Sequence, residues 1–175
     1  MIKSEQIAVA KNYLGNLSED ESLAQTVAVA KVKGNYLEVF LQQSDRQKGR
    51  IQAESTSGIN VGIIKNRDWS LRPDDVFQTE AGQYLLIHLQ EQKVMVLSFT
   101  ESIADQGIKL LHLGHTLGNH HWPIAIHHDK IYLQLIVDEA VVEKTIKDFQ
   151  IPGLHFEYEW RSPQKSLHFA HHHHH

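Results

Sequence analysis

The stretch KIYLQLIVDEAVVEKTIKDFQIPGLHFEYEW, residues 130–160, contains the pattern of a strand, a helix and a second strand. Apolar and polar residues alternate over 130–137 and again over 154–160, which is the period of a β-strand. Asp138 is placed to cap a helix, which Pro152-Gly153 would end. The predicted inward residues are Ile131, Leu133, Leu135 and Val137, then Val142, Ile146 and Phe149, then Leu154, Phe156, Tyr158 and Trp160.

The residues before this stretch complete a longer pattern. KVMVLSF (93–99) predicts a strand, and PIAI (123–126) predicts the first strand of a hairpin with 130–137. Between them Thr100 is the expected N-cap of a helix, along which Ile103, Leu110, Leu111 and Leu117 recur at helical spacing. Gly107, Gly114 and Gly118 share one stripe of that helix and would allow another element to approach closely. The order βαββαβ predicts a ferredoxin-like domain.

The first half of the chain predicts a β-rich domain. TVAVAKV (26–32), YLEVFLQ (36–42), GINVGIIK (58–65) and YLLIHL (84–89) are rich in β-branched or aromatic residues and are separated by turn residues. We expect a small sandwich or barrel, with at most a short helix over residues 4–14. The overall class is therefore α+β, with a β-rich domain over 1–91, a ferredoxin-like domain over 92–161 and a disordered, histidine-rich tail over 162–175.

The composition limits which ligands, nucleophiles and partners the protein can use. The 175 residues are 41% hydrophobic, contain no cysteine and carry a formal charge of −4, with 14 histidines counted as neutral. Cysteine ligands, disulfides and thiol nucleophiles are therefore excluded, and no basic surface marks a nucleic-acid partner. We find no membrane span and no signal peptide at the first residues, which predicts a cytoplasmic protein. Any soft-metal chemistry must use histidine.

The candidate ligands lie in GHTLGNHHWP, residues 114–123, and around it. His120 and His121 stand where the first long helix of the second domain should end. One imidazole binds a divalent metal weakly, so either a twofold axis pairs two copies of His121, or the histidines only end a helix. His112 and His115 are three residues apart and could chelate a metal on one helix face. His127 and His128 fall in a hairpin turn.

The carboxyl end adds a second histidine cluster, consisting of His168, His171, His172, His173, His174 and His175. Such a cluster would bind nickel, copper or zinc, and a purification tag has the same composition, so both interpretations stay open. In the first domain Arg46, Lys48 and Arg50 occupy alternate positions. On a strand they would share one face and could dock an acidic partner, or they could simply protect a sheet edge.

Two stretches resemble the UreE family of urease accessory metallochaperones. LGHTLGNHHWP (113–123) is similar to that family's helix-end signature, in which an LGN-type triplet, a basic or polar residue and a histidine follow one another. DRQKGRIQAESTSGINVGI (45–63) and LRPDDVF (71–77) are similar to its amino-terminal segment. The resemblance extends from about residue 26 to residue 160, and its motifs occur in the same order.

The resemblance implies a cytoplasmic chaperone that delivers Ni²⁺ to apo-urease and is not itself an enzyme. It implies a homodimer formed through the ferredoxin-like domain, with His121 as the shared metal ligand. His120 stands where the family usually has arginine or glutamine, so the resemblance assigns it no role, and we consider it an accessory ligand on its position alone. Zn²⁺ or Cu²⁺ would also bind such a site. The implied partners are the GTPase UreG and the apo-urease complex. A second histidine pair known in some members is replaced here by Leu135 and Val137, unless His127 and His128 substitute for it.

Two other functions remain open from the sequence. A metal-dependent hydrolase could use the same histidines, but it would need a carboxylate base near the metal. A protein or RNA interaction module with a histidine tag would bind no metal once the tail is removed. HExxH, GxSxG, GxxxxGK[ST] and GxGxxG are all absent from the sequence, which favours binding over catalysis.

Overall fold

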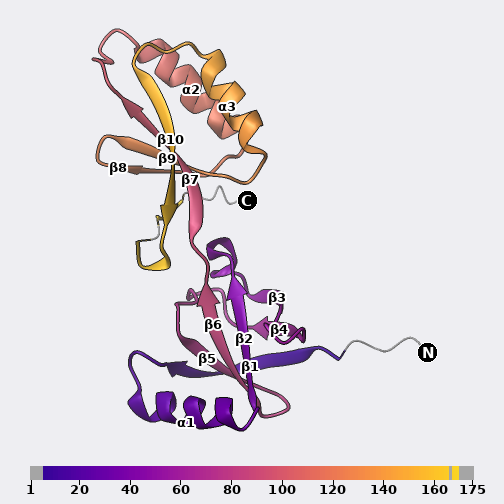
Figure 1. Cartoon of the computed structure of the whole chain (residues 1–175). Coiled ribbons are helices and arrows are strands. Elements are labelled where there is room, and N and C mark those ends of the chain that lie inside the picture. The colour runs from indigo at the N-terminus through magenta and orange to yellow at the C-terminus, as the bar shows by residue number, and fades with distance from the viewer. Residues whose placement is uncertain (1–5, 166, 170–175) are drawn as a thin grey trace, which may run out of the picture. The chain divides into compact units, whose positions relative to one another are not determined.

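The computed structural model describes residues 6–165 and 167–169 of the chain. The chain divides into two compact units, Met1–Glu91 and Gln92–His175 (Figure 1). Each unit has its own sheet, and the protein is of the α+β class.

Unit 1 is a six-stranded sheet with the strand order β2-β6-β5-β1-β4-β3. The pairs β1–β4 and β2–β6 are parallel and the others are antiparallel. The sheet approaches a barrel, because the Thr56 N–H, just after β3, donates to the Glu38 carbonyl on β2 over 3.0 Å. Its elements are β1 (Ala8–Asn16), α1 (Glu21–Val32), β2 (Tyr36–Leu41), the 3-10 turn η1 (Gln43–Asp45), β3 (Arg50–Glu54), β4 (Asn60–Ile64), β5 (Asp75–Thr79) and β6 (Tyr84–Leu89).

Three of the predicted strands of unit 1 are confirmed, as β2, β4 and β6, but the strand prediction for residues 26–32 is wrong. They belong to α1, which begins after Asp20, whose carboxylate accepts the Leu23 N–H over 3.0 Å. Val27 and Ala30, one helical turn apart, are the buried positions. The β-branched residues predicted a strand, whereas the cap and the packing of this helical face favour a helix. The short helix expected over 4–14 is also wrong, because β1 occupies most of that range.

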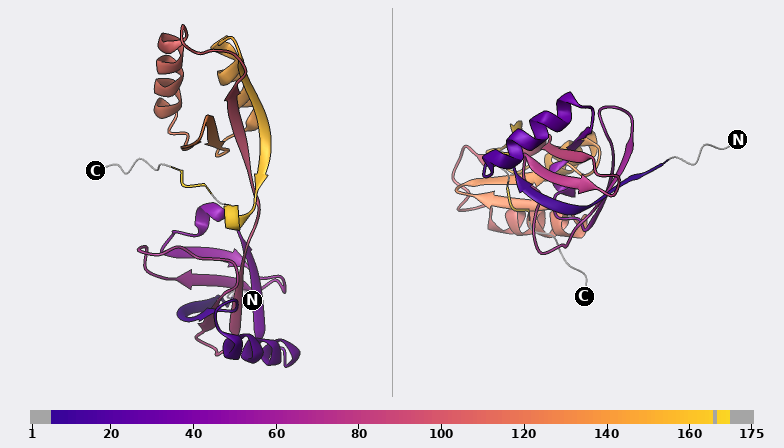
Figure 2. Two further views of the ribbon diagram at one scale, coloured as in Figure 1. Left: turned by 90° about the vertical axis from the view of Figure 1, so that its left-hand side faces the viewer. Right: turned by 90° about the horizontal axis from the view of Figure 1, so that it is seen from below.

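Unit 2 has the element order βαββαβ and an antiparallel sheet of order β10-β7-β9-β8. Figure 2 shows β7 and β10 as long neighbouring strands. Both helices contribute to one core with Met95 and Leu97 of β7, through Leu113 and Leu117 of the first helix and Val142 and Ile146 of the second. The elements are β7 (Gln92–Phe99), α2 (Gly107–Asn119), β8 (Ile124–His127), β9 (Lys130–Gln134), α3 (Glu139–Asp148), β10 (Leu154–Arg161) and the 3-10 turn η2 (Pro163–Lys165).

The two helix starts predicted in unit 2 had different outcomes. The cap of α3 is confirmed, because the Asp138 carboxylate accepts the Ala140 N–H over 2.9 Å. Thr100 does not cap α2, which begins at Gly107. The Thr100 N–H instead donates to the Gly153 carbonyl over 2.9 Å. Glu101 packs so closely on Gly153 that a Cβ there would lie 2.8 Å from the Glu101 Cβ. The loop before α2 is therefore held by backbone contacts to the chain after α3.

Three expectations near the end of unit 2 need correction. Strand β9 ends at Gln134, so Val137 lies beyond it and is exposed. Trp160 is 63% exposed although it alternates with the inward residues of β10, because the core beside it ends before this position. Residues 162–175 were expected to be disordered, yet 163–165 form η2 and Leu167 and Phe169 pack against the sheet. His171–His175 lie outside the described residues.

Candidate metal site

Helix α2 ends in a Schellman motif built by the candidate histidines. His120 is the C-cap, the His121 N–H donates to the Gly118 carbonyl over 3.0 Å, and the Trp122 N–H donates to the Leu117 carbonyl over 3.2 Å. Trp122 and Leu117 are both buried in the core of the unit, as the hydrophobic contact of this motif requires. The backbone of the stretch therefore ends the helix, which is one of the two roles considered from the sequence.

His121 occupies the position of this motif that glycine normally takes. Its φ is +54°, in the left-handed region, and the residue is exposed. A side chain in this region costs about 1 kcal/mol or more relative to glycine. Helix termination therefore does not require an imidazole here, and glycine would terminate the helix better.

The neighbouring histidines have other partners. The ring of His120 stacks on Trp122, with centroids 4.5 Å apart and an interplanar angle of 15°. His115 is hydrogen-bonded through Nε2 to the Asn119 side chain at 3.0 Å. His112 meets Phe149 edge to face at 5.0 Å. All three histidines are exposed.

The hairpin histidines do meet each other. The rings of His127 and His128 lie edge to face with centroids 4.1 Å apart, and His128 has a φ of +55°. His168 is exposed between Leu167 and Phe169. Across residues 6–165 and 167–169, no group of three or more histidine, aspartate or glutamate side chains is arranged to hold a metal ion.

The outer face of α2 is apolar and open. Ile108 is 82% exposed and Leu111 is 73% exposed, one turn apart on the side opposite the buried Leu113 and Leu117. Within the described chain, nothing lies within 4 Å of a Cβ placed on Gly107, Gly114 or Gly118. The close approach expected along the glycine stripe is therefore not made by the described residues. The sequence pattern placed Leu111 among the core positions, whereas it belongs to this open face.

The basic residues of unit 1 do not lie on one strand. Arg46 follows η1, Lys48 is in the next turn and pairs with Asp45, and only Arg50 is in β3. Two backbone hydrogen bonds join this segment to a second loop. The Leu71 N–H donates to the Arg46 carbonyl over 2.9 Å, and the Lys65 N–H donates to the Gly49 carbonyl over 3.0 Å.

The second loop adds a cation that the sequence pattern missed. Arg67 is exposed and lies over Gly49. A Cβ placed on Gly49 would be 3.1 Å from the Cγ of Arg67. The glycine between Lys48 and Arg50 was the available signal, since it permits this close approach. Arg46, Lys48, Arg50 and Arg67, here called the basic edge, therefore come from two joined loops.

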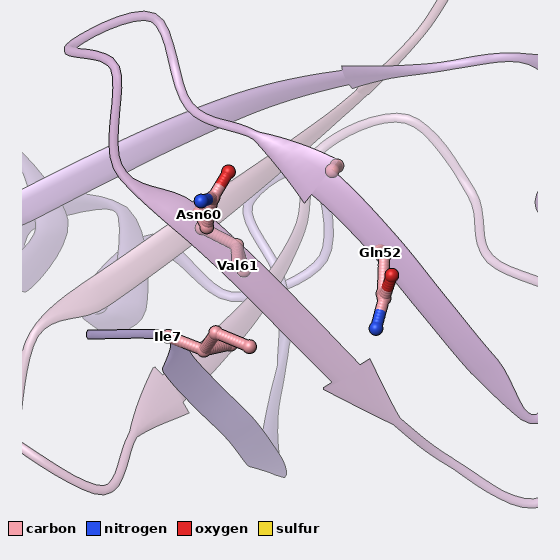
Figure 3. A pocket seen from close by; sticks show the side chains of 5 residues that line it. Ile7, Gln52, Asn60 and Val61 are labelled. Carbon is pink, nitrogen blue, oxygen red and sulfur yellow. The ribbon is translucent and has the colours of Figure 1, made fainter. Parts of the chain in front are cut away.

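Unit 1 also has a surface pocket of about 340 Å³. Figure 3 shows Ile7, Gln52, Asn60 and Val61 around it, on neighbouring segments of the sheet, and Ala53 also lines it. None of these five described side chains is an acid, a base or a nucleophile. Elsewhere in this unit, Nε2 of His88 is hydrogen-bonded to the Glu38 carboxylate at 2.9 Å, and the ring of His88 stacks on Phe40. These contacts give that histidine a structural role.

No helix among the described residues is long and apolar enough to cross a membrane.

Comparison with known proteins confirms the resemblance found in the sequence. A urease accessory protein UreE from Yersinia mollaretii is 28% identical over 155 residues, covering 85% of this chain and 65% of that protein. The UreE of Edwardsiella ictaluri is 27% identical over 158 residues, covering 86% and 68%. That of Yersinia pestis (strain Pestoides F) is 27% identical over 154 residues, covering 85% and 65%.

The chain thus spans just under two thirds of the length of these Yersinia relatives. No protein-family model matches the chain. The similarities are consistent with the UreE family.

Proposed function

We propose that the chain is a urease accessory protein of the UreE type, which binds Ni²⁺ through His121 and delivers it to apo-urease in the cytoplasm. The observation that carries the proposal is an exposed imidazole at the C-terminal end of α2, in a turn position that favours glycine. The similarity to proteins named urease accessory protein UreE supports it. The chain acts as a carrier with nickel as its cargo and not as an enzyme.

A homodimer completes the metal site. Because one imidazole is a weak ligand, two copies of His121 must converge, which a twofold axis achieves without further sequence. The open face of α2 suits such an axis, since its exposed Ile108 and Leu111 would be buried and its glycines allow close packing. In this proposal unit 2 is a ferredoxin-like domain that both dimerises and binds metal.

A site with two imidazoles and water ligands also suits a carrier. Nickel binds nitrogen ligands more tightly than manganese, iron or cobalt does, while Cu²⁺ binds more tightly still and Zn²⁺ competes. Few protein ligands allow the ion to leave when a receiving site offers more. His120 is the proposed accessory ligand, and its stacking on Trp122 would bring a bound ion near a fluorescent ring.

The remaining histidines are proposed as secondary ligands. The contact between His127 and His128 supports a second, weaker position at the hairpin. His112 and His115 would first have to leave Phe149 and Asn119. His168 and His171–His175 would collect metal at high local concentration.

The basic edge of unit 1 is the proposed docking surface for partners, among them the GTPase UreG and the apo-urease complex. Arginine pairs well with carboxylates through two parallel hydrogen bonds, and three of the four cations of the edge are arginines. No nucleic-acid partner is proposed for a chain with a formal charge of −4.

Nickel titration by calorimetry tests the central proposal. The full chain with His171–His175 replaced by serine isolates the site at α2. His121→Asn removes the imidazole yet keeps a residue that tolerates the left-handed turn. The matched control is Gln150→Asn, which changes an exposed residue of nearly the same φ. We expect one nickel per dimer in the parent and in the control, and no binding to the His121 variant.

Equal nickel binding by all three proteins would exclude His121 as the ligand. If the parent itself binds no nickel, the chain is an interaction module and the histidine tail is its only metal-binding segment. Steady hydrolytic turnover by the nickel-loaded parent would favour the hydrolase instead.

A further inference from the structure

Trp122 is firmly held in the turn that follows α2. Its side chain is only 6% exposed and belongs to the core of unit 2. Its backbone N–H donates to the Leu117 carbonyl over 3.2 Å, and Leu117 lies in the same core. Pro123 comes next, and a proline restricts the backbone of the residue before it. The indole therefore has little freedom to move relative to the end of the helix.

The ring of His120 lies with one face against this indole. The two centroids are 4.5 Å apart and the ring planes differ by 15°, which is a stacked arrangement. His120 is the C-cap of α2 and is exposed to solvent. Stacking on a buried aromatic ring is favourable, and it limits the rotamers that an exposed side chain would otherwise sample. The imidazole is therefore ordered in the absence of an ion.

The stack leaves the coordinating atoms of His120 available. An imidazole binds a metal through a nitrogen lone pair at the edge of the ring. A contact through the face of the ring occupies neither nitrogen. Within the part of the chain that the structure describes, the His120 ring makes this stacking contact and no hydrogen bond. His120 thus combines an ordered ring with two nitrogens that can accept an ion.

The nearest histidine on α2 does not have this combination. Nε2 of His115 is hydrogen-bonded to the Asn119 side chain at 3.0 Å. An ion that bound this nitrogen would have to break that bond, whereas the stack of His120 on Trp122 can persist while an ion binds. The comparison favours His120 over His115 as the second ligand beside His121.

We propose that Trp122 is a positioning residue of the nickel site, because its indole holds the His120 imidazole ready to act as the accessory ligand. This inference rests on the proposed function, since it assigns a role within nickel binding. A side chain that is already ordered loses little conformational freedom when it binds, which raises the affinity. In the proposed homodimer the effect operates once in each chain, so its loss should weaken nickel binding about tenfold.

A double-mutant cycle measured by nickel calorimetry tests this role, using the full chain with His171–His175 replaced by serine. Trp122→Leu keeps an apolar side chain in the core but removes the aromatic face, whereas Trp122→Phe retains a smaller aromatic face. We expect nickel affinity to fall about tenfold in Trp122→Leu and at most about threefold in Trp122→Phe. In a His120→Asn background, Trp122→Leu should change the affinity by less than about twofold, because Trp122 acts through His120.

Tryptophan fluorescence gives a second measurement. The chain has three tryptophans, so Trp69→Phe/Trp160→Phe leaves Trp122 as the one indole. An ion bound to the stacked imidazole lies close to this indole, and nickel should therefore quench its emission. His120→Asn in the same background should remove most of the quenching, because the ion is then no longer held beside Trp122.

Two results of the cycle would overturn this inference alone. Equal losses from Trp122→Leu in both backgrounds would mean that Trp122 only supports the turn. An unchanged or tighter affinity of Trp122→Leu in the His120 background would mean that the stack does not position a ligand. Either result leaves nickel binding through His121 intact, whereas a parent that binds no nickel overturns the proposed function as well.

Urea unfolding and light scattering verify that each variant is folded and has the mass of the parent. If Trp122→Leu does not fold, the same cycle with Trp122→Phe gives the answer from a smaller loss, which should again be absent in the His120→Asn background.

Discussion

Helices α2 and α3 pack into the same core of unit 2, yet they are stabilised differently. Asp138 caps α3, and the Tyr158 hydroxyl on β10 donates to Glu143 of the helix over 2.6 Å. Lys93 of β7 pairs with Glu139 in its first turn at 2.7 Å. In contrast, no side chain caps α2 at Gln106, and three of its positions are glycines.

The difference bears on the proposed homodimer. Glycine in a helix costs up to about 1 kcal/mol relative to alanine, and a missing N-cap costs a similar amount. Helix α2 bears both costs and still exposes Ile108 and Leu111. These features are consistent with the proposed homodimer, in which a second chain would bury Ile108 and Leu111.

The largest expected effect comes from a charge on the open face of α2. Leu111→Glu should convert the dimer to a monomer and weaken nickel binding roughly 100-fold, because a carboxylate cannot be buried unpaired in an apolar interface. Val141→Glu is the matched control on α3, since Val141 is also an exposed apolar residue of a helix in unit 2. Light scattering gives the mass and calorimetry the affinity. A dimer that persists in Leu111→Glu would remove the distinction between the helices.

The next largest effect concerns the residues at which α2 and α3 end. Helix α3 is followed by Gln150 with a φ of +49°, so both helices end beside a left-handed residue other than glycine. His121→Gly and Gln150→Gly should each raise the free energy of unfolding by about 1 kcal/mol. Only His121→Gly should abolish nickel binding. Urea denaturation and nickel titration of the two variants give both quantities, and a loss of nickel binding in Gln150→Gly would contradict the assignment.

A smaller effect is expected at the N-cap positions of α2 and α3. Asp138→Ala should lower the free energy of unfolding of unit 2 by about 1 kcal/mol through the lost cap. Gln106→Asp supplies α2 with a cap and should raise it by about 0.5 kcal/mol. Chemical denaturation measures both changes. If Gln106→Asp has no effect, the start of α2 is already satisfied by another group.

The smallest effect is on the pH dependence of α3. The hydrogen bond from Tyr158 lowers the pKa of Glu143, whereas burial and this bond raise the pKa of Tyr158. A lowered carboxyl pKa stabilises the fold above the ordinary value of about 4.3, and this contribution is lost as the pH falls through the folded-state pKa. Tyr158→Phe should therefore make stability less dependent on pH between about pH 5 and pH 3. Denaturation midpoints across that range measure the change.

Sequence patterns predicted unit 2 better than unit 1. The alternation of 154–160 and the Asp138 cap are local signals, and both are present in the structure apart from the exposed Trp160. In unit 1 the β-branched residues of 26–32 led to a strand prediction, and the cap at Asp20 was not recognised. The parallel pairs β1–β4 and β2–β6 join segments far apart in the chain, and no local pattern encodes such partners.

The candidate site was predicted through its resemblance to a family and not through spacing. A single histidine after a helix carries no pattern specific to metal binding, and the described residues hold no ligand group of three or more. Arg67 was missed because its neighbours in the basic edge lie on a different loop. The packing of Leu167 and Phe169 on the sheet was missed because two residues are too few to form a recognisable pattern.

By itself, the sequence determined the absence of cysteine chemistry, the βαββαβ order of the second half and the position of His121 after a helix. These features depend on residue types and on periods of a few residues, which local sterics and burial impose. Only the tertiary structure decided that Ile108 and Leu111 face outward, that two loops form the basic edge and that Leu167 and Phe169 pack against the cluster of Val94 and Val96. Each of these depends on which surfaces meet, because burial is a property of contacts between segments distant in the chain.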